Sequence, residues 1–512
     1  MKHATYFFLY LLASLLVTQA HADVSLPALF SDHMVLQRNK NIPIWGHSEA
    51  NEVVTVELDT QKVVTTADAT GSWYVHLSPI KAGGPYILTV SGNNTLTFKN
   101  VLIGDVWICS GQSNMQWAVR QSRNAQEEIA SAQHPKIRLF TVKRVAAQTP
   151  QQDVTGTWSV CDSQSVANFS AVGYFFGRQL NKTLNVPIGL INTSWGGTPV
   201  EAWTSLPALQ ATSDYEPLHQ RWTKNIAAYP QAQEKFEINL KNWQITSDSL
   251  KALGEKVPAR PRPPVGPNHP HRPSVLYNGM IAPLTPYAIQ GAIWYQGESN
   301  AGRAYQYLTI FPTMIRNWRA DWGQDAFPFL FVQLANFRQV KEQPAESDWA
   351  ELREAQQMTL ALPNTGMATI IDIGEADDIH PKNKQDVGLR LAWAAEAQVY
   401  GKNVPYSGPL YKSMQIEKGK IRITFDHTNG GLKKKGDKLT GFAIAGADKK
   451  FVWAEAKIDG NSVIISSKEV IAPVAVRYAW ADNPVCNLYN GANLPASPFR
   501  TDNWPGITAN KQ

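Results

Sequence analysis

The stretch GDVWICSGQSNM, from Gly104 to Met115, decides the fold of this chain and holds its first candidate reactive side chain. It opens with a short apolar run, Val106–Ile108, which is typical of a buried strand. The run ends in a polar turn with one glycine, and helix-compatible residues follow it. A strand, a sharp turn and a helix in this order can lift a serine hydroxyl above the edge of a sheet. We therefore interpret Ser113 as a candidate nucleophile; the alternative is that Ser110 and Ser113 only cap a helix.

The beginning of the chain has the pattern of a secretory signal. Lys2 supplies the positive charge, Tyr6–Val17 is the apolar core, and Ala20–Ala22 fits a cleavage site of small residues. The core is too short to span a bilayer, and no later run in the sequence is long and apolar enough to do so. We predict that residues 1–22 are removed and that the mature protein is exported, either to the periplasm or out of the cell, without a membrane span.

The composition indicates a globular protein with more than one domain. The chain has 512 residues, of which 43% are hydrophobic and 18% are charged, and its formal net charge is +6. This charge is small for the length, and the run Lys433–Lys435 is interpreted as a set of solvated loop charges. The sequence therefore does not predict binding to nucleic acid.

The cysteines and histidines predict no metal centre. The three cysteines, Cys109, Cys161 and Cys486, are widely spaced, so at most one pair can form a disulfide and the sequence leaves open which. No cluster of histidine and cysteine has the spacing of metal ligands. We expect neither a metal nor an organic cofactor.

The pattern along the chain divides it into regions of different secondary structure. Residues 23–100 have β-branched runs separated by turns and are predicted to be an N-terminal β domain. In residues 101–404 apolar strands alternate with helical stretches, which is typical of an α/β domain with parallel strands. Within it, residues 205–275 are helical in composition and then proline-rich, and they are interpreted as an insertion. Residues 405–512 return to β patterns and form a predicted C-terminal β region.

Polar residues gather where the predicted strands of the α/β region end. Ser110–Asn114, Asn192–Thr198, Tyr295–Asn300 and Gly374–Pro381 each follow an apolar run. In open α/β sheets, ligands bind at the carboxyl ends of the strands. The repetition of polar strand ends therefore predicts one constructed site.

A serine nucleophile needs a base and a group that orients the base. His380 is the best-placed histidine, at one of the predicted strand ends. Asp377 lies three residues before it, and a tight turn can bring that carboxylate back to the imidazole. Asp378 and Glu375 are the alternatives for the orienting role. A helix cap or a surface loop would also account for these residue types.

The tetrahedral intermediate of ester hydrolysis needs hydrogen-bond donors for its oxyanion. The candidates are the backbone amide of Ser113, an amide of the Gly196–Gly197 turn, and a side-chain amide from Gln296 or Asn114. Glycine lets a backbone amide approach a ligand closely, which favours the Gly196–Gly197 turn.

The motifs together resemble the sialate O-acetylesterase family, a branch of the SGNH-type hydrolases. The residues that carry the resemblance in the predicted site are Ser110–Met115, Ser194–Thr198, Trp294–Asn300 and Asp377–Pro381. Outside the site they are Leu29–Gln37, Leu276–Met280 and Ala496–Asp502. The resemblance therefore covers nearly the whole mature chain.

The resemblance implies an α/β fold with a three-layer, SGNH-hydrolase-like catalytic domain and flanking β-sandwich-type domains. It implies hydrolysis of O-acetyl esters on sugars, with Ser113 as nucleophile, His380 as base and Asp377 as orienting acid. The predicted oxyanion and substrate-binding residues are Gly196, Gly197, Gln296, Glu298, Gln112 and Asn114. It also implies that no cofactor is used.

The sequence says less about which sugar carries the acetyl group than about the reaction. The expected partner is an O-acetylated carbohydrate, with O-acetylated sialic acid favoured and acetylated xylan or xyloglucan as the alternative. Arg120, Arg272 and Arg353 are candidates to bind a sialic acid carboxylate. An alternative of another class is a non-catalytic glycan-binding protein in which the β regions are the functional part.

Overall fold

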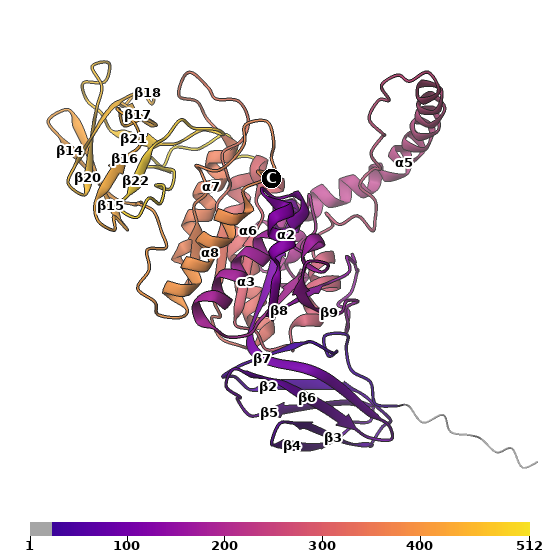
Figure 1. The fold of residues 1–512 in the computed structure, drawn as a ribbon. Coiled ribbons are helices and arrows are strands. Elements are labelled where there is room, and N and C mark those ends of the chain that lie inside the picture. Colours follow the sequence, from indigo (N-terminus) through magenta and orange to yellow (C-terminus); the bar gives the residue numbers. More distant parts are fainter. Residues whose placement is uncertain (1–22, 512) are drawn as a thin grey trace, which may run out of the picture.

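The computed structural model describes residues 23–511, so the predicted signal lies outside the described residues. A central α/β region joins an N-terminal β region to a C-terminal β region (Figure 1). Among the helices of residues 23–511, none is long and apolar enough to cross a membrane.

The strands of the N-terminal region pair antiparallel with one another, apart from the first, Val35–Gln37, which pairs in parallel with Leu102–Gly104. Its strands are β1 (Val35–Gln37), β2 (Ile42–His47), β3 (Val53–Leu58), β4 (Gln61–Thr66), β5 (Ser72–Leu77) and β6 (Gly83–Ser91). β2 pairs with β5, while β3 pairs with β4 and β6. Buried and more exposed residues alternate along β3 and β5, as expected of strands with one face in a core.

Strand β7 (Thr95–Gly111) connects this region to the central sheet. It is 17 residues long, and its first half pairs with β6 in the N-terminal region. Its second half is continuously buried and pairs in parallel with β10 and β11. The boundary predicted between residues 100 and 101 therefore falls inside one unbroken strand.

The central sheet has the strand order β13-β12-β11-β7-β10-β8-β9. The remaining strands are β8 (Gln133–Thr141), β9 (Trp158–Asp162), β10 (Ile188–Asn192), β11 (Gly291–Tyr295), β12 (Phe329–Val332) and β13 (Thr365–Ala368). All neighbours are parallel except β8 and β9. The predicted α/β class with parallel strands is confirmed, with an antiparallel edge strand added.

Helices cover both faces of this sheet. They are α3 (Ala171–Leu184) and α8 (Lys384–Gln398), which pack on each other, and α6 (Ala304–Trp322) and α7 (Asp348–Met358), which also pack on each other. Trp107 of β7 meets Phe176 of α3, and Trp294 of β11 meets Phe311 of α6. Trp294 pairs with Ser110, three residues from Trp107, so the two tryptophans point to opposite faces. The sheet is thus the middle of three layers.

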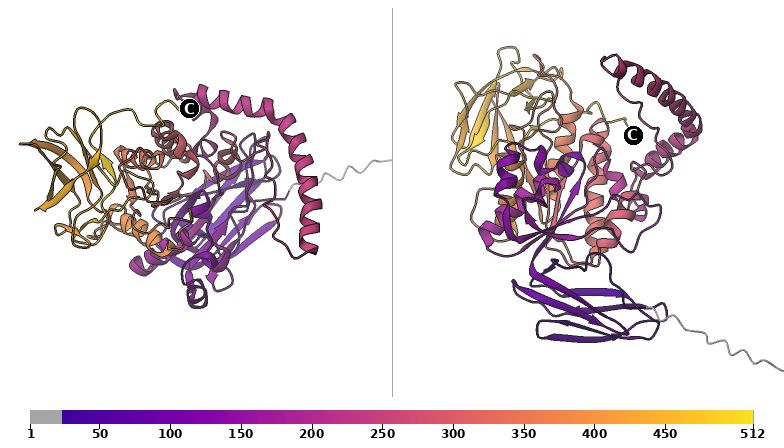
Figure 2. Two further views of the ribbon diagram at one scale, coloured as in Figure 1. Left: turned by 90° about the horizontal axis from the view of Figure 1, so that it is seen from above. Right: turned by 45° about the vertical axis from the view of Figure 1, so that its right-hand side comes forward.

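The polar segment predicted as an insertion holds α4 (Leu206–Gln210) and the long α5 (Tyr215–Ala252). The proline-rich residues that follow have no regular structure and run back along α5, where Trp243 donates to the carbonyl oxygen of Pro258 at 2.8 Å. Figure 2 shows α5 on the opposite side of the central region from the C-terminal β region.

The C-terminal region has its own hydrophobic core, built around Ile423, Val463, Ile465 and Val476. One sheet has the order β14-β15-β20-β19, another β18-β17-β21-β23, and β16 pairs with β22. The strands are β14 (Leu410–Glu417), β15 (Lys420–Asp426), β16 (Leu432–Lys434), β17 (Phe442–Ala445), β18 (Val452–Trp453), β19 (Glu455–Asp459), β20 (Ser462–Ser466), β21 (Ala475–Tyr478), β22 (Leu488–Asn490) and β23 (Phe499–Arg500).

The contact between Gly111 and β11 generates the first prediction. Gly111 has φ +135°, and a Cβ atom there would lie 2.2 Å from the carbonyl oxygen of Tyr295. Gly111→Ala should lower the free energy of unfolding by about 3 kcal/mol or more, because backbone strain and a steric clash add. Gly254→Ala is the matched control, since Gly254 also has a positive φ, +72°, but no atom within 4 Å. The control should cost about 1 kcal/mol in urea unfolding; equal losses for the two variants would contradict the clash.

Candidate active site

The candidate nucleophile stands directly at the carboxyl end of β7. After Gly111 the chain turns, and Ser113 begins the short helix α1 (Ser113–Gln116). The turn is held from two sides, because the Gln112 amide donates to the Tyr295 carbonyl oxygen at 2.9 Å and the Trp195 amide donates to that of Gly111 at 3.0 Å. Ser113 is partly exposed, whereas its neighbours Gln112 and Asn114 are buried.

The turn of Ser113 is in contact with the loop of His380. Trp117 lies one helical turn after Ser113, and its amide donates to the Ser113 carbonyl oxygen at 2.9 Å. The Trp117 ring stacks on the His380 ring, with 4.8 Å between centroids and 13° between planes. The Asn114 side chain also donates to the Ile379 carbonyl oxygen at 3.0 Å. The structure thus brings together two loops that are more than 260 residues apart in sequence.

The acidic residues near His380 differ in what they contact. Asp378 accepts the His380 backbone amide at 2.8 Å, and its Oδ1 lies 3.7 Å from the ring Nδ1. The Asp377 carboxylate accepts from Gln339 Nε2 at 2.7 Å, and that of Glu375 from the Lys382 amide at 2.9 Å. Asp378 is therefore the carboxylate that contacts the imidazole, at a distance longer than a hydrogen bond.

The pKa of His380 is lowered from its ordinary value. Burial of the ring is the main cause, the charge of Lys384 adds to it, and Asp378 opposes it. A lowered pKa keeps the imidazole neutral near pH 7, and the neutral form is the one that can accept a proton.

A buried polar network lies behind the two loops, and its lysine was missed by the sequence reasoning. Lys384 Nζ donates to Asn114 Oδ1 at 2.5 Å, and Asn114 Nδ2 donates to Glu298 Oε1 at 2.6 Å. Burial lowers the pKa of Lys384 to about 7 and raises that of Glu298. The only sequence signal for Lys384 is its position four residues after His380, and a lysine at a helix start is usually solvated.

Two backbone amides are free in the turns that contain Ser113 and Gly196. Gly196 packs directly against Ser113, since a Cβ on Gly196 would lie 3.2 Å from Ser113 Cβ. The Gly196 amide is already used, because it donates to Gln116 Oε1 at 2.7 Å. By contrast, the amides of Ser113 and Gly197 have no hydrogen-bond acceptor within residues 23–511. Gly197 also has φ +77°, and a Cβ atom added to it would have no atom within 4 Å.

Gln296 and Gln112 lie in the interior of the protein. Gln296 Nε2 donates to Thr198 O at 3.2 Å and to Asn300 Oδ1 at 2.6 Å, so both of its amide hydrogens are used. Gln112 Oε1 accepts the Ser299 amide at 3.2 Å. These contacts place both glutamines as supports of the loop after β11, and they leave Gln296 without a free amide hydrogen for an oxyanion.

A polar cavity of about 310 Å³ adjoins the Gly197 turn. Its lining includes Ser299, His271 and two arginines, Arg221 and Arg303, whose guanidinium groups lie 3.1 and 3.0 Å from the same oxygen of Glu201. Burial alone would raise the pKa of Glu201, but the two guanidinium groups outweigh it and the pKa is lowered. Two cations against one anion leave an excess of positive charge in this cavity.

The three arginines predicted as carboxylate ligands are not among the residues that line this cavity. Arg353 is fully buried and donates to four backbone carbonyl oxygens. The prediction that Arg353 binds a carboxylate of the substrate is therefore wrong. Arg120 is exposed and bonds to Asn168. Arg272 donates to the Pro267 carbonyl oxygen at 3.4 Å, and its guanidinium carbon lies 5.9 Å from the ring of Trp222 at the cavity. The sequence shows where the arginines are, but it does not show which of them line a cavity.

The cysteines and acidic residues form no further centre. Cys109, Cys161 and Cys486 are all free thiols, which settles the disulfide question. In the part of the chain that the structure describes, no three histidine, cysteine, aspartate or glutamate side chains are grouped so that they could hold a metal ion.

Comparison with known proteins gives consistent results. Residues 103–237 and 269–397 match a family described as carbohydrate esterase, sialic acid-specific acetylesterase. The chain is 33% identical to a sialate O-acetylesterase of Mus musculus, over 91% of this chain and 92% of that protein. It is 32% identical to the Homo sapiens enzyme, over 94% and 93%. A crystal structure of a carbohydrate acetylesterase from Xanthomonas citri is similar with a TM-score of 0.81 and 40% identity, and it covers 94% of this chain and 100% of that one.

The charge of Lys384 generates a prediction on pH dependence. Loss of this cation in Lys384→Met removes one cause of the low pKa of His380, so that pKa should rise. If His380 must be neutral to act, hydrolysis falls as the pH drops through its pKa, and the acid limb of kcat/KM for 4-nitrophenyl acetate should move to higher pH. Lys382→Met is the control, since Lys382 is exposed and its charge is screened by water. If the acid limb of Lys384→Met stays at the wild-type pH or moves to lower pH, the coupling between Lys384 and His380 is contradicted.

Proposed function

The chain belongs to the sialic acid-specific acetylesterase family of carbohydrate esterases and is a carboxylic ester hydrolase, and on this basis we propose that Ser113 is the nucleophile that removes acetyl groups from sugar hydroxyls. The observation that carries the proposal is the position of Ser113. It lies at the end of a central strand, next to free backbone amides, on a helical turn that stacks on His380. A non-catalytic glycan-binding role does not fit this family.

The proposed reaction has two half-reactions. Ser113 Oγ attacks the acetyl carbonyl carbon while His380 takes the hydroxyl proton, and the resulting imidazolium then protonates the sugar oxygen that leaves. Water, deprotonated by His380, next attacks the acetyl-enzyme, and Ser113 leaves with the proton as acetate is released. The lowered pKa of His380 supports this role, because the base must be neutral at the start.

The oxyanion is proposed to bind to the amides of Ser113 and Gly197. Both lack an acceptor within the described chain, and both belong to turns that touch each other through Gly196. Preorganised amides of this kind stabilise the charge of the tetrahedral intermediate. Gln296, Gln112, Asn114 and Glu298 are proposed to support these turns from behind.

We propose that one carboxylate of the Asp377–Asp378 pair orients His380. The sequence spacing and the family resemblance favour Asp377, whereas the contact at 3.7 Å favours Asp378. Catalytic hydrogen bonds are often long in the absence of substrate, so distance alone does not decide between neighbouring carboxylates.

Substitution of each carboxylate separates the two roles. Of Asp377→Asn and Asp378→Asn, one should lower kcat for 4-nitrophenyl acetate by about a hundredfold or more, because the imidazolium loses its counter-charge. The other should stay within about threefold of the wild type, as expected for a loop hydrogen bond. Thermal melting of both variants is measured alongside the two assays, so that a loss of activity can be distinguished from a loss of folding. Two near-normal variants would remove the carboxylate from the mechanism.

For the substrate, we propose O-acetylated sialic acid. The cavity beside Gly197 supports this choice, since its two arginines and one glutamate leave positive charge next to the proposed oxyanion turn. A sugar carboxylate is the natural partner of such a guanidinium pair. Neutral plant glycans such as acetylated xylan are the alternative. Either substrate is compatible with the proposal that residues 1–22 direct export of the protein. For the fold, we propose that the three-layer α/β region is an SGNH-type catalytic domain.

Acetate release from two substrates tests both steps of the proposal. O-acetylated sialic acid should be cleaved at least about tenfold faster in kcat/KM than acetylated xylo-oligosaccharide, which corresponds to one charge-assisted contact. Ser113→Ala should abolish release from both by several orders of magnitude. Ser131→Ala, an exposed serine on helix α2 (Ala125–Ser131), is the matched control. A preference for the xylan substrate would be compatible with the proposed mechanism but would contradict sialic acid as the substrate. An active Ser113→Ala variant would contradict the mechanism.

A further inference from the structure

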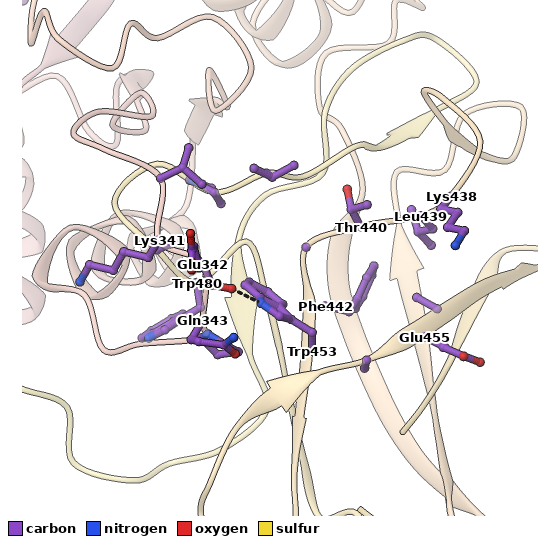
Figure 3. A pocket seen from close by; sticks show the side chains of 18 of the residues that line it. Lys341, Glu342, Gln343, Lys438, Leu439, Thr440, Phe442, Trp453, Glu455 and Trp480 are labelled. Atoms are coloured by element: carbon purple, nitrogen blue, oxygen red, sulfur yellow. Dashed lines mark hydrogen bonds between the residues drawn. The ribbon is translucent and has the colours of Figure 1, made fainter. Parts of the chain in front are cut away.

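A second and larger cavity, of about 940 Å³, lies between the C-terminal β region and a loop of the central region (Figure 3). The loop is residues 340–345, which follow β12 and precede α7. The opposite wall comes from β17, β18 and the segment after β21, with Phe442, Trp453 and Trp480. None of the residues of the proposed active site lines this cavity.

Its surface combines apolar faces with a charged rim. Trp453 is 44% exposed, and Val340 and Val485 are 52% and 61% exposed, so three large apolar side chains meet water around one opening. Charged side chains of both signs surround them: Lys341, Glu342, Lys438, Glu455 and Lys457. Exposed apolar groups rimmed by polar ones mark binding grooves. A sugar ring has the matching chemistry, with C–H faces that pack on an indole and hydroxyls at its edge.

One polar atom in the wall has no partner. The indole nitrogen of Trp453 donates to the Glu342 carbonyl oxygen at 2.7 Å, which Figure 3 shows as a dashed line. The indole nitrogen of Trp480, a residue only 7% exposed, has no acceptor in the described chain. A buried donor without an acceptor is costly. A hydroxyl oxygen of a ligand in the cavity is an acceptor of the kind that this nitrogen lacks.

The loop that closes the cavity also touches the candidate active site. Gln339, directly before it, donates to Asp377 at 2.7 Å, and the Arg338 amide donates to the Ala376 carbonyl oxygen at 3.0 Å. The Arg338 side chain bonds to Asp482 at 3.1 Å, beside the opposite wall. Residues 338–339 therefore connect the loop at the wall of the cavity to the loop of His380.

We propose that this cavity is a second carbohydrate site, which binds a distal part of the glycan chain whose acetyl group is removed at Ser113. The occupant rests on the proposed function, because it is the chain of the same substrate. Stacking on Trp453 and hydrogen bonds to the charged rim hold the chain, and the site contributes to binding of long substrates without taking part in the chemistry.

The direct test is binding to the full-length Ser113→Ala protein, which does not depend on hydrolysis. Calorimetric titration with a deacetylated sialic acid oligomer and with xylohexaose should show binding of one of them, and Trp453→Ala should weaken it by about tenfold, as for the loss of one stacked ring. Val485→Asp, at an exposed position, should weaken it as well. Tyr74→Ala removes an equally exposed ring (46%) from the N-terminal region and should leave binding unchanged.

The kinetic test uses the active enzyme. Trp453→Ala should raise KM for a long acetylated oligosaccharide by about tenfold and leave kcat and the hydrolysis of 4-nitrophenyl acetate unchanged. Absence of binding of both oligosaccharides, or equal affinity in Trp453→Ala, Val485→Asp and the parent, would overturn the second site. Such a result would leave the esterase proposal intact, whereas failure of acetate release would overturn that proposal and leave the titration valid.

Discussion

The close packing of Gly111 on the Tyr295 carbonyl is the constraint on which the rest of the site depends. Two parallel strands, β7 and β11, end side by side there, and only a residue without a Cβ allows them to approach so closely. The positive φ of Gly111 then turns the chain so that the next residues start a helix. Ser113 is held above the sheet by this turn, and its amide is left free because it is the first of the helix.

The buried polar side chains behind Ser113 do not favour the stability of the fold. Lys384, Asn114 and Glu298 are hydrogen-bonded in a chain, but burial lowers the pKa of the lysine to about 7 and leaves one oxygen of the glutamate without a partner. Buried ionic groups are seldom the most stable filling of a core. The network joins the two loops, and the charge of Lys384 adds to burial in lowering the pKa of His380.

The C-terminal β region is part of the same construction and more than an appended module. Arg353 on α7 is fully buried and donates to carbonyl oxygens at the end of β12 and in residues 481–482, so one side chain connects the two regions. Burial lowers the pKa of Arg353 to about 9, a penalty that these four acceptors offset. A further contact, between Arg477 and Glu346 at 2.7 Å, holds the start of α7. This fixed interface is what creates the larger cavity and places its loop beside Asp377.

The sequence by itself determined the features that depend on local patterns. The apolar run before Ser113, the alternation of strands and helices, and the polar strand ends with His380 are short-range signals, and they were enough for the α/β class and the family. Only the tertiary structure decided which side chains meet across the chain. Lys384 could not be predicted as buried, Arg303 and Arg221 could not be preferred to Arg353, and Gln296 could not be recognised as fully bonded. In each case the partner lies on another element, and contact and burial between elements are set by packing, which residue type and spacing along the chain do not encode locally.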